Sequence, residues 1–207
     1  VAANWELTAI PMFLLMGALV TRAGMATDLF DAARLWLARV PGGLAVSANL
    51  AAAGFGAASG SSLAASAAMT RLAVPEMLRH GYDRGLAAGV VASAGTLAAL
   101  IPPSVMFVLY GVFAEVSIAA LLMAGLLPGL LTAAAYTAMI VVRCRLNPAL
   151  APALPPNPRF LQQRRSATAR IWPLAALMAG VIGALYAGLV TPTEAGAAGA
   201  ALALALA

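Results

Sequence analysis

Long apolar stretches separated by short polar interruptions run along the whole chain. The first, at about 7–20, ends at the polar residues Thr21, Arg22 and Gly24. The next segment, 28–40, places its large apolar residues at helical spacing on one face, with acids early and arginines late, as a helix dipole favours. We therefore expect a truncated transmembrane helix at 1–24 and an amphipathic arm helix at 25–42, lying at the membrane interface.

Two short apolar limbs follow the arm helix. The first limb, 44–59, would rise only about 24 Å as a helix, less than the roughly 30 Å hydrocarbon core. The sequence Ser-Gly-Ser-Ser then interrupts it, and the second limb, 63–74, is shorter still and is predicted to end at Pro75. This pattern predicts a re-entrant hairpin over 43–82 with its tip near the midplane. Non-helical backbone is tolerated at that depth only where protein buries it or where it lines a watery cavity.

A double proline interrupts the next apolar run. Residues 86–100 would climb about 22 Å before the sequence Ile-Pro-Pro-Ser at 101–104, and 105–113 would complete the crossing. Because proline lacks an N–H and clashes with the preceding turn, the helix cannot continue unbroken. We expect a discontinuous transmembrane helix over 83–116.

The remaining pattern predicts two full spans and the start of a third. We expect transmembrane helices at 117–142 and 171–191, and the beginning of a further one at 192–207. Between the first two lies 143–170, with six arginines and five prolines, which we interpret as a cytoplasmic basic loop. The predicted fold class is an all-α polytopic membrane protein. Because the chain opens on Val1 without a start methionine and stops at Ala207 inside an apolar run, we expect it to be an internal piece of a longer protein.

Composition and charge agree with a membrane location. The chain is 63% hydrophobic and only 9% charged, whereas soluble domains carry about 25% charged residues. Its basic residues are twelve arginines, grouped at 22–39, 71–84 and 143–170 between apolar spans. This is the positive-inside pattern, and it lacks the basic face expected of a nucleic-acid-binding protein. The arginine-bearing side is therefore expected to be cytoplasmic. Arg71 lies inside a hairpin limb, so its side chain must reach the interface or find a partner.

The two predicted interruptions form the candidate site. A broken helix leaves carbonyl groups with partial negative charge at one half-helix end and amide groups with partial positive charge at the other. Carbonyl and hydroxyl oxygens suit Na⁺, and amide groups suit a carboxylate. We expect Na⁺ near Ser61, Ser62 and Gly95. The full candidate set for substrate and sodium is Ser59, Gly60, Ser61, Ser62, Gly95, Thr96, Pro102, Pro103 and Ser104.

A structural interpretation of the same residues competes with this one. Ala57, Ser61 and Ala65 follow four-residue spacing, which often serves only to bring helices close together. Packing requires small residues but no double proline, so the combination of the two interruptions favours a site.

Several isolated residues allow two interpretations each. Cys144 is the single cysteine, which excludes an intrachain disulfide and a thiolate metal cluster; it is either palmitoylated or, as we favour, unmodified at the interface. Glu76 and Asp83 flank His80 and form either a proton relay or, as we favour, solvated charge pairs. Glu194 follows a Thr-Pro-Thr sequence and is either a gating residue or a helix cap.

Other function classes remain open from the residues alone. An intramembrane serine hydrolase using Ser59, Ser61 or Ser62 would need a base and an oxyanion hole, yet no histidine or lysine lies in a predicted span. A passive channel usually builds a pore ring by oligomerisation, and a structural assembly module is a further option. We favour a carrier: not an enzyme, and with no cofactor other than Na⁺ as a coupling ion.

Four motifs in a fixed order resemble one known family. They are GSS-x-A at 60–64, PEM-x-x-x-GYD at 75–83, IPPS at 101–104 and TPTEA at 191–195. The combination resembles the large membrane (M) subunit of TRAP transporters, the tripartite ATP-independent periplasmic carriers, in its dicarboxylate-type permease. Similar stretches at 9–20, 40–45, 124–131 and 186–200 extend the resemblance over nearly the whole chain.

The resemblance implies an elevator-type carrier built from two inverted repeats, of which this chain would hold most of the first and the start of the second. It implies sodium-coupled uptake of small organic acids such as C4-dicarboxylates, with sodium held between hairpin tip and broken helix. It also implies three partners besides the lipid bilayer and no nucleic acid: a small Q-type membrane subunit, a periplasmic P-type binding protein and the organic acid. The location it implies is the bacterial inner membrane.

Overall fold

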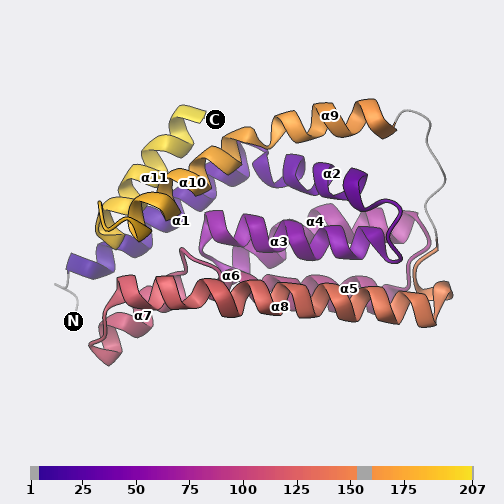
Figure 1. Ribbon diagram of the computed structural model, residues 1–207, viewed down its shortest axis with the longest axis horizontal. Coiled ribbons are helices and arrows are strands. Elements are labelled where there is room, and N and C mark those ends of the chain that lie inside the picture. The colour runs from indigo at the N-terminus through magenta and orange to yellow at the C-terminus, as the bar shows by residue number, and fades with distance from the viewer. Residues whose placement is uncertain (1–4, 153–159, 207) are drawn as a thin grey trace.

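The computed structural model describes residues 5–152 and 160–206, and within these ranges every regular element is a helix. The helices run roughly along one long axis, so the molecule is an elongated bundle (Figure 1). This confirms the all-α prediction. Among the described residues, three helices are long and apolar enough to cross a membrane, at Trp5–Arg22, Ile118–Leu146 and Gln163–Tyr186, and a bent pair that counts as one span would raise the number to four.

The first and last helices of the chain pack side by side. Helix α1 (Ala9–Arg22), preceded by a short 3₁₀ turn (Trp5–Thr8), lies against α11 (Pro192–Leu206). A Cβ added at Gly196 of α11 would lie 3.0 Å from the Met12 Cβ of α1. Small residues on α11 thus let the two backbones approach closely, and α10 (Trp172–Tyr186) covers α11 from another side.

The arm helix and the first hairpin limb meet at a turn that only glycine fits. Helix α2 (Met25–Leu37) is followed after five residues by α3 (Gly43–Ser59). Gly42 has φ +70°, and a Cβ there would lie 2.7 Å from the Cys144 Sγ. A Cβ at Gly43 would overlap the Leu37 carbonyl oxygen. The Pro41-Gly42-Gly43 sequence therefore allows the chain to reverse its direction sharply beside α8.

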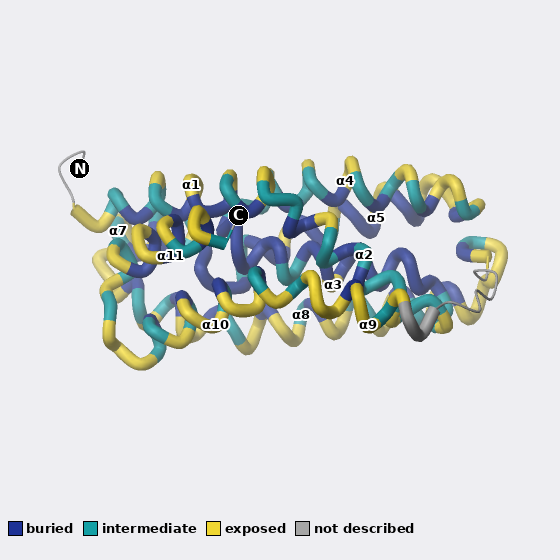
Figure 2. The backbone as a smooth tube through the Cα atoms, turned by 90° about the horizontal axis from the view of Figure 1, so that it is seen from above, coloured by how far each residue is buried: buried dark blue, intermediate teal, exposed yellow. Residues whose placement is uncertain are grey.

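Helix α3 is the most buried element of the bundle and pairs with α4 (Ser62–Arg79) as a helical hairpin (Figure 2). The hairpin closes at its base, where the Leu44 backbone N–H donates to the Tyr82 hydroxyl over 3.3 Å. The prediction that the second limb ends at Pro75 was wrong, since α4 continues four residues beyond it. Pro75 is exposed, so the carbonyl that it leaves without an intrahelical bond does not have to be buried.

The broken helix consists of α5 (Arg84–Gly95), the single turn α6 (Leu97–Leu100) and α7 (Val105–Ala114), with a bend of 48° at the break. Helix α8 (Ile118–Leu146) then runs the length of the bundle as a 29-residue helix (Figure 1). Pro128 lies inside α8 without ending it.

The predicted basic loop at 143–170 was wrong over much of its length. Helix α8 continues to Leu146, a 3₁₀ turn occupies Pro148–Leu150, and 160–170 form α9 (Phe160–Arg170). The reason is a tertiary contact, because α9 packs against α2 and Arg164 of α9 bonds the α2 backbone. Residues 153–159 of that predicted loop lie outside the described part.

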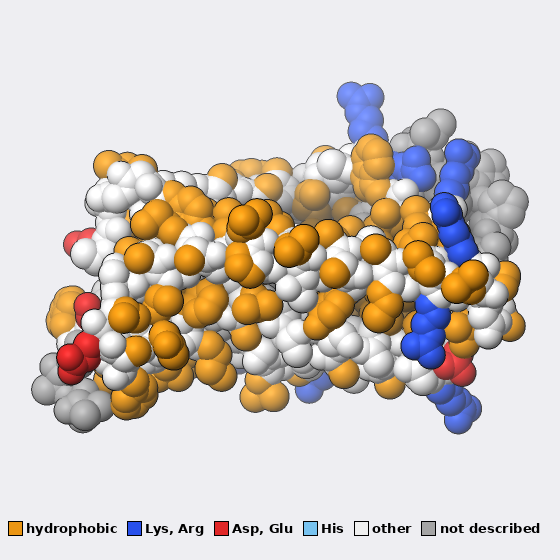
Figure 3. All heavy atoms as spheres, turned by 60° about the horizontal axis from the view of Figure 1, so that its bottom comes forward, with side chains coloured by type: hydrophobic (Ala, Val, Ile, Leu, Met, Phe, Trp, Pro, Cys, Tyr) orange, Lys and Arg blue, Asp and Glu red, His pale blue; other side chains and the backbone are white. Residues whose placement is uncertain are grey.

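The charged residues gather at the two ends of the long axis. On the face in Figure 3, most arginine side chains cluster at one end, together with some acidic side chains, and further acidic side chains mark the other end, while apolar side chains cover much of the length between them. Glu115 and Glu194 belong to the acidic end, at the C-terminus of α7 and the N-terminus of α11. This distribution suits a protein whose middle lies in lipid.

Candidate functional site

The hairpin tip is a tight turn between two helix ends. Gly60 ends α3 with φ +61°, and its N–H donates to the Gly56 carbonyl over 2.7 Å. Ser61 is extended and caps α4, because its Oγ accepts from the Ala64 N–H over 3.3 Å. The Ser61 hydroxyl thus has a structural role in this arrangement. Ser62 begins α4 and is partly buried.

The break between α6 and α7 is also held by a serine. Ile101 and Ser104 are extended, with the two prolines between them. The Ser104 side chain is fully buried, and its hydroxyl donates to the Ala99 carbonyl over 2.8 Å. Ser104 therefore bonds a carbonyl near the end of the short α6 turn, where helical partners run out. Thr96, in contrast, is exposed and donates to Ser93 within its own helix.

The tip and the break touch each other through their backbones. The Val105 N–H at the start of α7 donates to the Gly60 carbonyl over 3.1 Å. A Cβ added at Gly60 would lie only 2.8 Å from the Pro103 carbonyl oxygen. These contacts bring together Gly60, Pro103 and Ser104, and they require a glycine at the tip both for its φ and for its size.

Gly95 meets the second hairpin limb rather than the tip itself. A Cβ at Gly95 would overlap the Ser66 Oγ of α4. Gly56 of α3 is likewise close to α6, with an added Cβ 2.6 Å from the Ala98 Cβ. The broken helix therefore packs on both limbs, and Ser66 is a polar neighbour of the break that the sequence pattern did not single out.

Ser59 is the unusual polar group of this region. It is the last residue of α3, it is buried, and its Oγ has no hydrogen-bond partner among the described residues. Its Cα also lies against α1, since a Cβ at Gly17 would be 2.8 Å away. An unpaired buried hydroxyl costs free energy, so a group at this position is suited to bind something that supplies the missing interaction.

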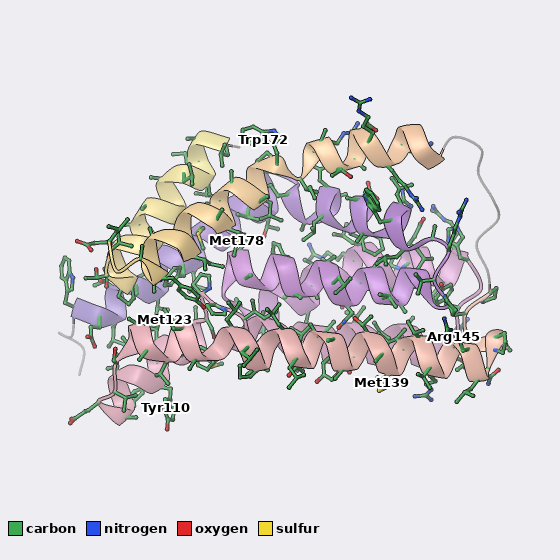
Figure 4. All side chains as sticks on the ribbon, viewed as in Figure 1. Tyr110, Met123, Met139, Arg145, Trp172 and Met178 are labelled. Atoms are coloured by element: carbon green, nitrogen blue, oxygen red, sulfur yellow. The ribbon has the colours of Figure 1, made fainter. Side chains whose placement is uncertain are left out.

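Four helix ends meet here with alternating polarity. The C-terminal ends of α3 and α6 present carbonyl groups, and the N-terminal ends of α4 and α7 present amide groups. An apolar cluster of Ala57, Leu97, Ile101 and Ala133 packs beside them, and Met178 of α10, labelled in Figure 4, packs against this cluster. The arrangement can hold a cation at the carbonyl ends and an anion at the amide ends, within an apolar surround.

A buried amide ties the hairpin to the long helix α8, and the sequence analysis missed it. The Asn49 Nδ2 of α3 donates to the Ala133 carbonyl and to the Thr137 Oγ1, each over 3.0 Å. Asn49 also lines a groove of about 320 Å³ between α3, α5 and α8. The groove extends along α5 from Ser93 to Asp83, and it reaches Arg143 at the arginine-rich end.

The remaining candidates are accounted for by pairing and capping. Glu76 pairs with Arg34 of the arm helix over 2.6 Å and with Arg79 over 3.5 Å. Asp83 caps α5, because its Oδ1 accepts from the Leu86 N–H over 2.8 Å. The favoured reading of charge pairs thus fits Glu76, but with an additional partner that lies 42 residues earlier.

Glu194 forms a reciprocal cap with Thr191. The Glu194 Oε2 accepts from the Thr191 N–H over 2.7 Å, and the Thr191 Oγ1 accepts from the Glu194 N–H over 3.3 Å. The bonds from the Thr191 backbone and hydroxyl lower the pKa of the Glu194 carboxyl. This geometry supports the capping interpretation.

Comparison with known proteins places the whole chain in one group. The profile of the family described as "Tripartite ATP-independent periplasmic transporter, DctM component" matches residues 1–207. Similar proteins include the C4-dicarboxylate TRAP transporter large permease protein DctM of Pseudomonas aeruginosa, 41% identical over 94% of this chain and 44% of that protein. The 2,3-diketo-L-gulonate TRAP transporter large permease protein YiaN of Escherichia coli is 38% identical over 98% of this chain and 47% of that protein.

A third relative carries another substrate name. The ectoine/5-hydroxyectoine TRAP transporter large permease protein UehC of Ruegeria pomeroyi is 35% identical over 93% of this chain and 44% of that protein. The chain thus spans less than half the length of the curated relatives that it matches.

Proposed function

The chain belongs to the DctM family of tripartite ATP-independent periplasmic (TRAP) transporters, and from that membership we propose that it forms part of a sodium-coupled carrier for small organic acids. Its relatives are named as permeases, so the chain is a transporter component and not an enzyme. Because it spans less than half of those relatives, the coupled activity is a property of the whole permease.

The observation that carries this proposal is the contact between two interrupted helices. The bond from the Val105 N–H to the Gly60 carbonyl joins the tip of the hairpin to the break in the next helix. Irregular backbone at membrane depth is tolerated where protein buries it, and paired breaks of this kind are a recurring way to build a carrier site. Na⁺ would be held by carbonyl oxygens at the ends of α3 and α6, with the Ser59 hydroxyl beside them.

The proposed substrates are C4-dicarboxylates or related carboxylates. The most similar relative described above is named for C4-dicarboxylates, and amide groups at the starts of α4 and α7 suit an anionic group. The groove that leads from Ser93 to Arg143 supports a release route toward the arginine-rich end. By the positive-inside rule that end faces the cytoplasm of a bacterial inner membrane.

The proposed mechanism is of the elevator type with binding-protein delivery. The hairpin and the broken helix would move together as one body, and the arm helix α2 would connect them to the rest of the permease. A periplasmic binding protein of the P type would deliver the acid, and a small membrane subunit of the Q type would support the large one. The name of an isethionate relative, the TRAP transporter permease protein DctMQ, fits such a pairing.

The serine hydrolase alternative fails on geometry. The Ser61 hydroxyl caps α4, while His80 lies just beyond the opposite end of that helix, where its Nδ1 is 2.9 Å from the Glu76 carbonyl. An 18-residue helix separates the two, about 27 Å at the usual rise. A base at that distance cannot activate the serine.

Sodium-dependent uptake into proteoliposomes tests the proposal. The intact permease, reconstituted with its partner subunits, is expected to take up a C4-dicarboxylate only when a sodium gradient is present. Uptake without sodium, or unchanged by its gradient, would contradict a coupled carrier and would favour a channel.

A serine series tests the site. In Ser59→Ala we expect the sodium concentration for half-maximal uptake to rise about tenfold, the equivalent of one lost interaction of about 1.4 kcal/mol. Ser47→Ala is the matched control, because Ser47 is a buried serine of the same helix α3 and its hydroxyl already donates to the Gly43 carbonyl over 2.6 Å. Equal sodium dependence in Ser59→Ala and the control would remove the Ser59 side chain from the site.

A further inference from the structure

A groove at the arginine-rich end lies outside the candidate carrier site. It has a volume of about 500 Å³ and lies where the C-terminal part of α2 meets α9. Its lining residues are Trp36, Arg164, Arg165, Thr168 and Ala169. The elements that form it are the interfacial arm helix and the helix that replaces part of the predicted basic loop (Figure 1).

Arg164 fixes the shape of this groove. Its Nε donates to the Leu35 carbonyl over 2.8 Å, and its Nη2 donates to the Trp36 carbonyl over 3.4 Å. These carbonyls belong to the last turn of α2, where the helix dipole favours a cation. The guanidinium carbon also lies 5.4 Å from the centroid of the Trp36 ring, within cation–π range. The guanidinium is therefore held in place.

Trp36 is held in the same way although it is largely exposed. Its Nε1 donates to the Thr168 Oγ1 over 2.9 Å, yet 57% of the residue remains accessible. Trp172, just beyond the end of α9, is 60% exposed. Tryptophan side chains of this kind are typical of the level of the lipid head groups, where an apolar ring and a polar N–H are both accommodated.

The described residues that line the groove carry positive charge and no negative charge, and Asp31 of α2 pairs with Arg34 outside the groove. From 143 to 193 the sequence has six arginines and no aspartate or glutamate. No acidic side chain lines the groove in the described part of the chain, and Arg165 is exposed beside it. A preformed cationic site with tryptophan at its edge is complementary to a phosphate ester at a membrane surface.

We propose that this groove binds the phosphate head group of an anionic phospholipid. Arg165 and the fixed Arg164 would contact the phosphate, and Trp36 would pack beside the glycerol backbone. The lipid would bridge α2 and α9, so it would fasten the arm helix to the basic segment at the membrane surface. This role is independent of sodium and of the transported acid.

Native mass spectrometry of the intact transporter, purified in a neutral detergent, tests this site. Phosphatidylglycerol and phosphatidylcholine with identical acyl chains are titrated separately, and the apparent Kd of the first bound lipid is measured. We expect phosphatidylglycerol to bind more tightly than phosphatidylcholine. Arg165→Gln should weaken phosphatidylglycerol about fivefold, as expected for one arginine near an anionic surface, and leave phosphatidylcholine unchanged.

Arg145→Gln is the matched control. Arg145 is exposed at the arginine-rich end of α8, across the bundle from α9 (Figure 4), so its loss changes the net charge equally without touching the groove. We expect no change in phosphatidylglycerol binding for this variant. Equal weakening in both variants, no weakening in Arg165→Gln, or equal binding of the two lipids would overturn the proposal. Glycerol 1-phosphate that competes at the same concentration as the lipid would also overturn it, in favour of a free phosphate ester.

Discussion

At the scale of single residues, the contact between the hairpin and the broken helix requires that residue 60 is a glycine, without a side chain. It has φ +61°, its carbonyl accepts from the Val105 N–H, and the Pro103 oxygen occupies the space of a Cβ. Left-handed backbone costs other residues about 1–2 kcal/mol before any clash is added. The tip is therefore intolerant of even the smallest side chain.

We expect Gly60→Ala to lower the free energy of unfolding by at least about 1–2 kcal/mol, measured by thermal unfolding in detergent. The matched control is Gly183→Ala in α10, since a Cβ there would meet nothing within 4 Å. That change should be neutral or stabilising by about 0.5–1 kcal/mol, because alanine favours a helix. A Gly60→Ala protein as stable as the control would show that the tip does not contact the break as described.

Features that depend on a residue's own backbone could be predicted from the sequence, whereas hydrogen bonds to residues far along the chain could not. The interruptions at Gly60 and at the double proline follow from the residues themselves, because φ and the missing N–H are local properties. Ser59, Ser61 and Ser104 were also expected, but not which of them has a free hydroxyl. Asn49 gave no signal, since its partners Ala133 and Thr137 lie 84 and 88 residues later.

At the scale of elements, an ion pair links the arm helix α2 to the second hairpin limb α4. The Arg34 Nη1 lies 2.6 Å from the Glu76 Oε1, and the Arg34 Nε lies 3.0 Å from the Asp31 Oδ1 of its own helix. The Glu76 side chain is only 17% exposed and the Arg34 side chain 36%. The ion pair is thus intermediate between exposed salt bridges, which contribute little to stability, and buried salt bridges, which are costly to break.

We expect Arg34→Gln to lower the free energy of unfolding by about 1–2 kcal/mol, because Glu76 loses its closest partner. Arg79→Gln serves as the control: Arg79 is 79% exposed and 3.5 Å from Glu76, so its loss should cost less than about 0.5 kcal/mol. A double-mutant cycle with Glu76→Gln should give a coupling energy for Arg34 that exceeds that for Arg79. A coupling near zero for Arg34 would show that α2 and α4 are not joined by this pair.

Elements were predictable where an apolar pattern defines them. Helix α9 was missed because its sequence, FLQQRRSATAR, is polar and lacks a helical apolar face of its own. Its contact with α2 depends on Arg164 bonding a carbonyl 129 residues earlier, which no local pattern reveals. The end of α4 was predicted too early because Pro75 is a strong local signal for the end of a helix. Pro75 is exposed, so the helix tolerates the missing backbone hydrogen bond and continues.

At the scale of the whole molecule, arginine distinguishes the two ends of the bundle, because most arginine side chains gather at one of them (Figure 3). The sequence predicted this distribution, because the positive-inside pattern depends only on which connections carry arginine. The motifs also predicted the family, and the family profile confirms it. The packing of the last helix against the first was not predicted, since both are uniformly apolar and the sequence does not distinguish their partners.

Labelling from the two sides of the membrane tests the orientation. In a Cys144→Ala background, single cysteines at Arg165 and at Val116 are expected to react with a membrane-impermeant maleimide from opposite sides. Arg165→Cys should react in inverted vesicles and Val116→Cys in right-side-out vesicles, because the arginine-rich end is proposed to be cytoplasmic and Val116 is 45% exposed beside Glu115. Labelling of both from one side would contradict the proposed topology.

The Asn49 amide has a consequence for any sliding of the hairpin along α8. Its single nitrogen bonds the Ala133 carbonyl and the Thr137 hydroxyl, which lie one helical turn apart. A shift by less than a full turn would break both bonds together and leave a buried amide without its two partners. The amide therefore destabilises positions of the hairpin that lie between two helical turns of α8. We expect the hairpin to occupy discrete positions along α8 that differ by whole turns.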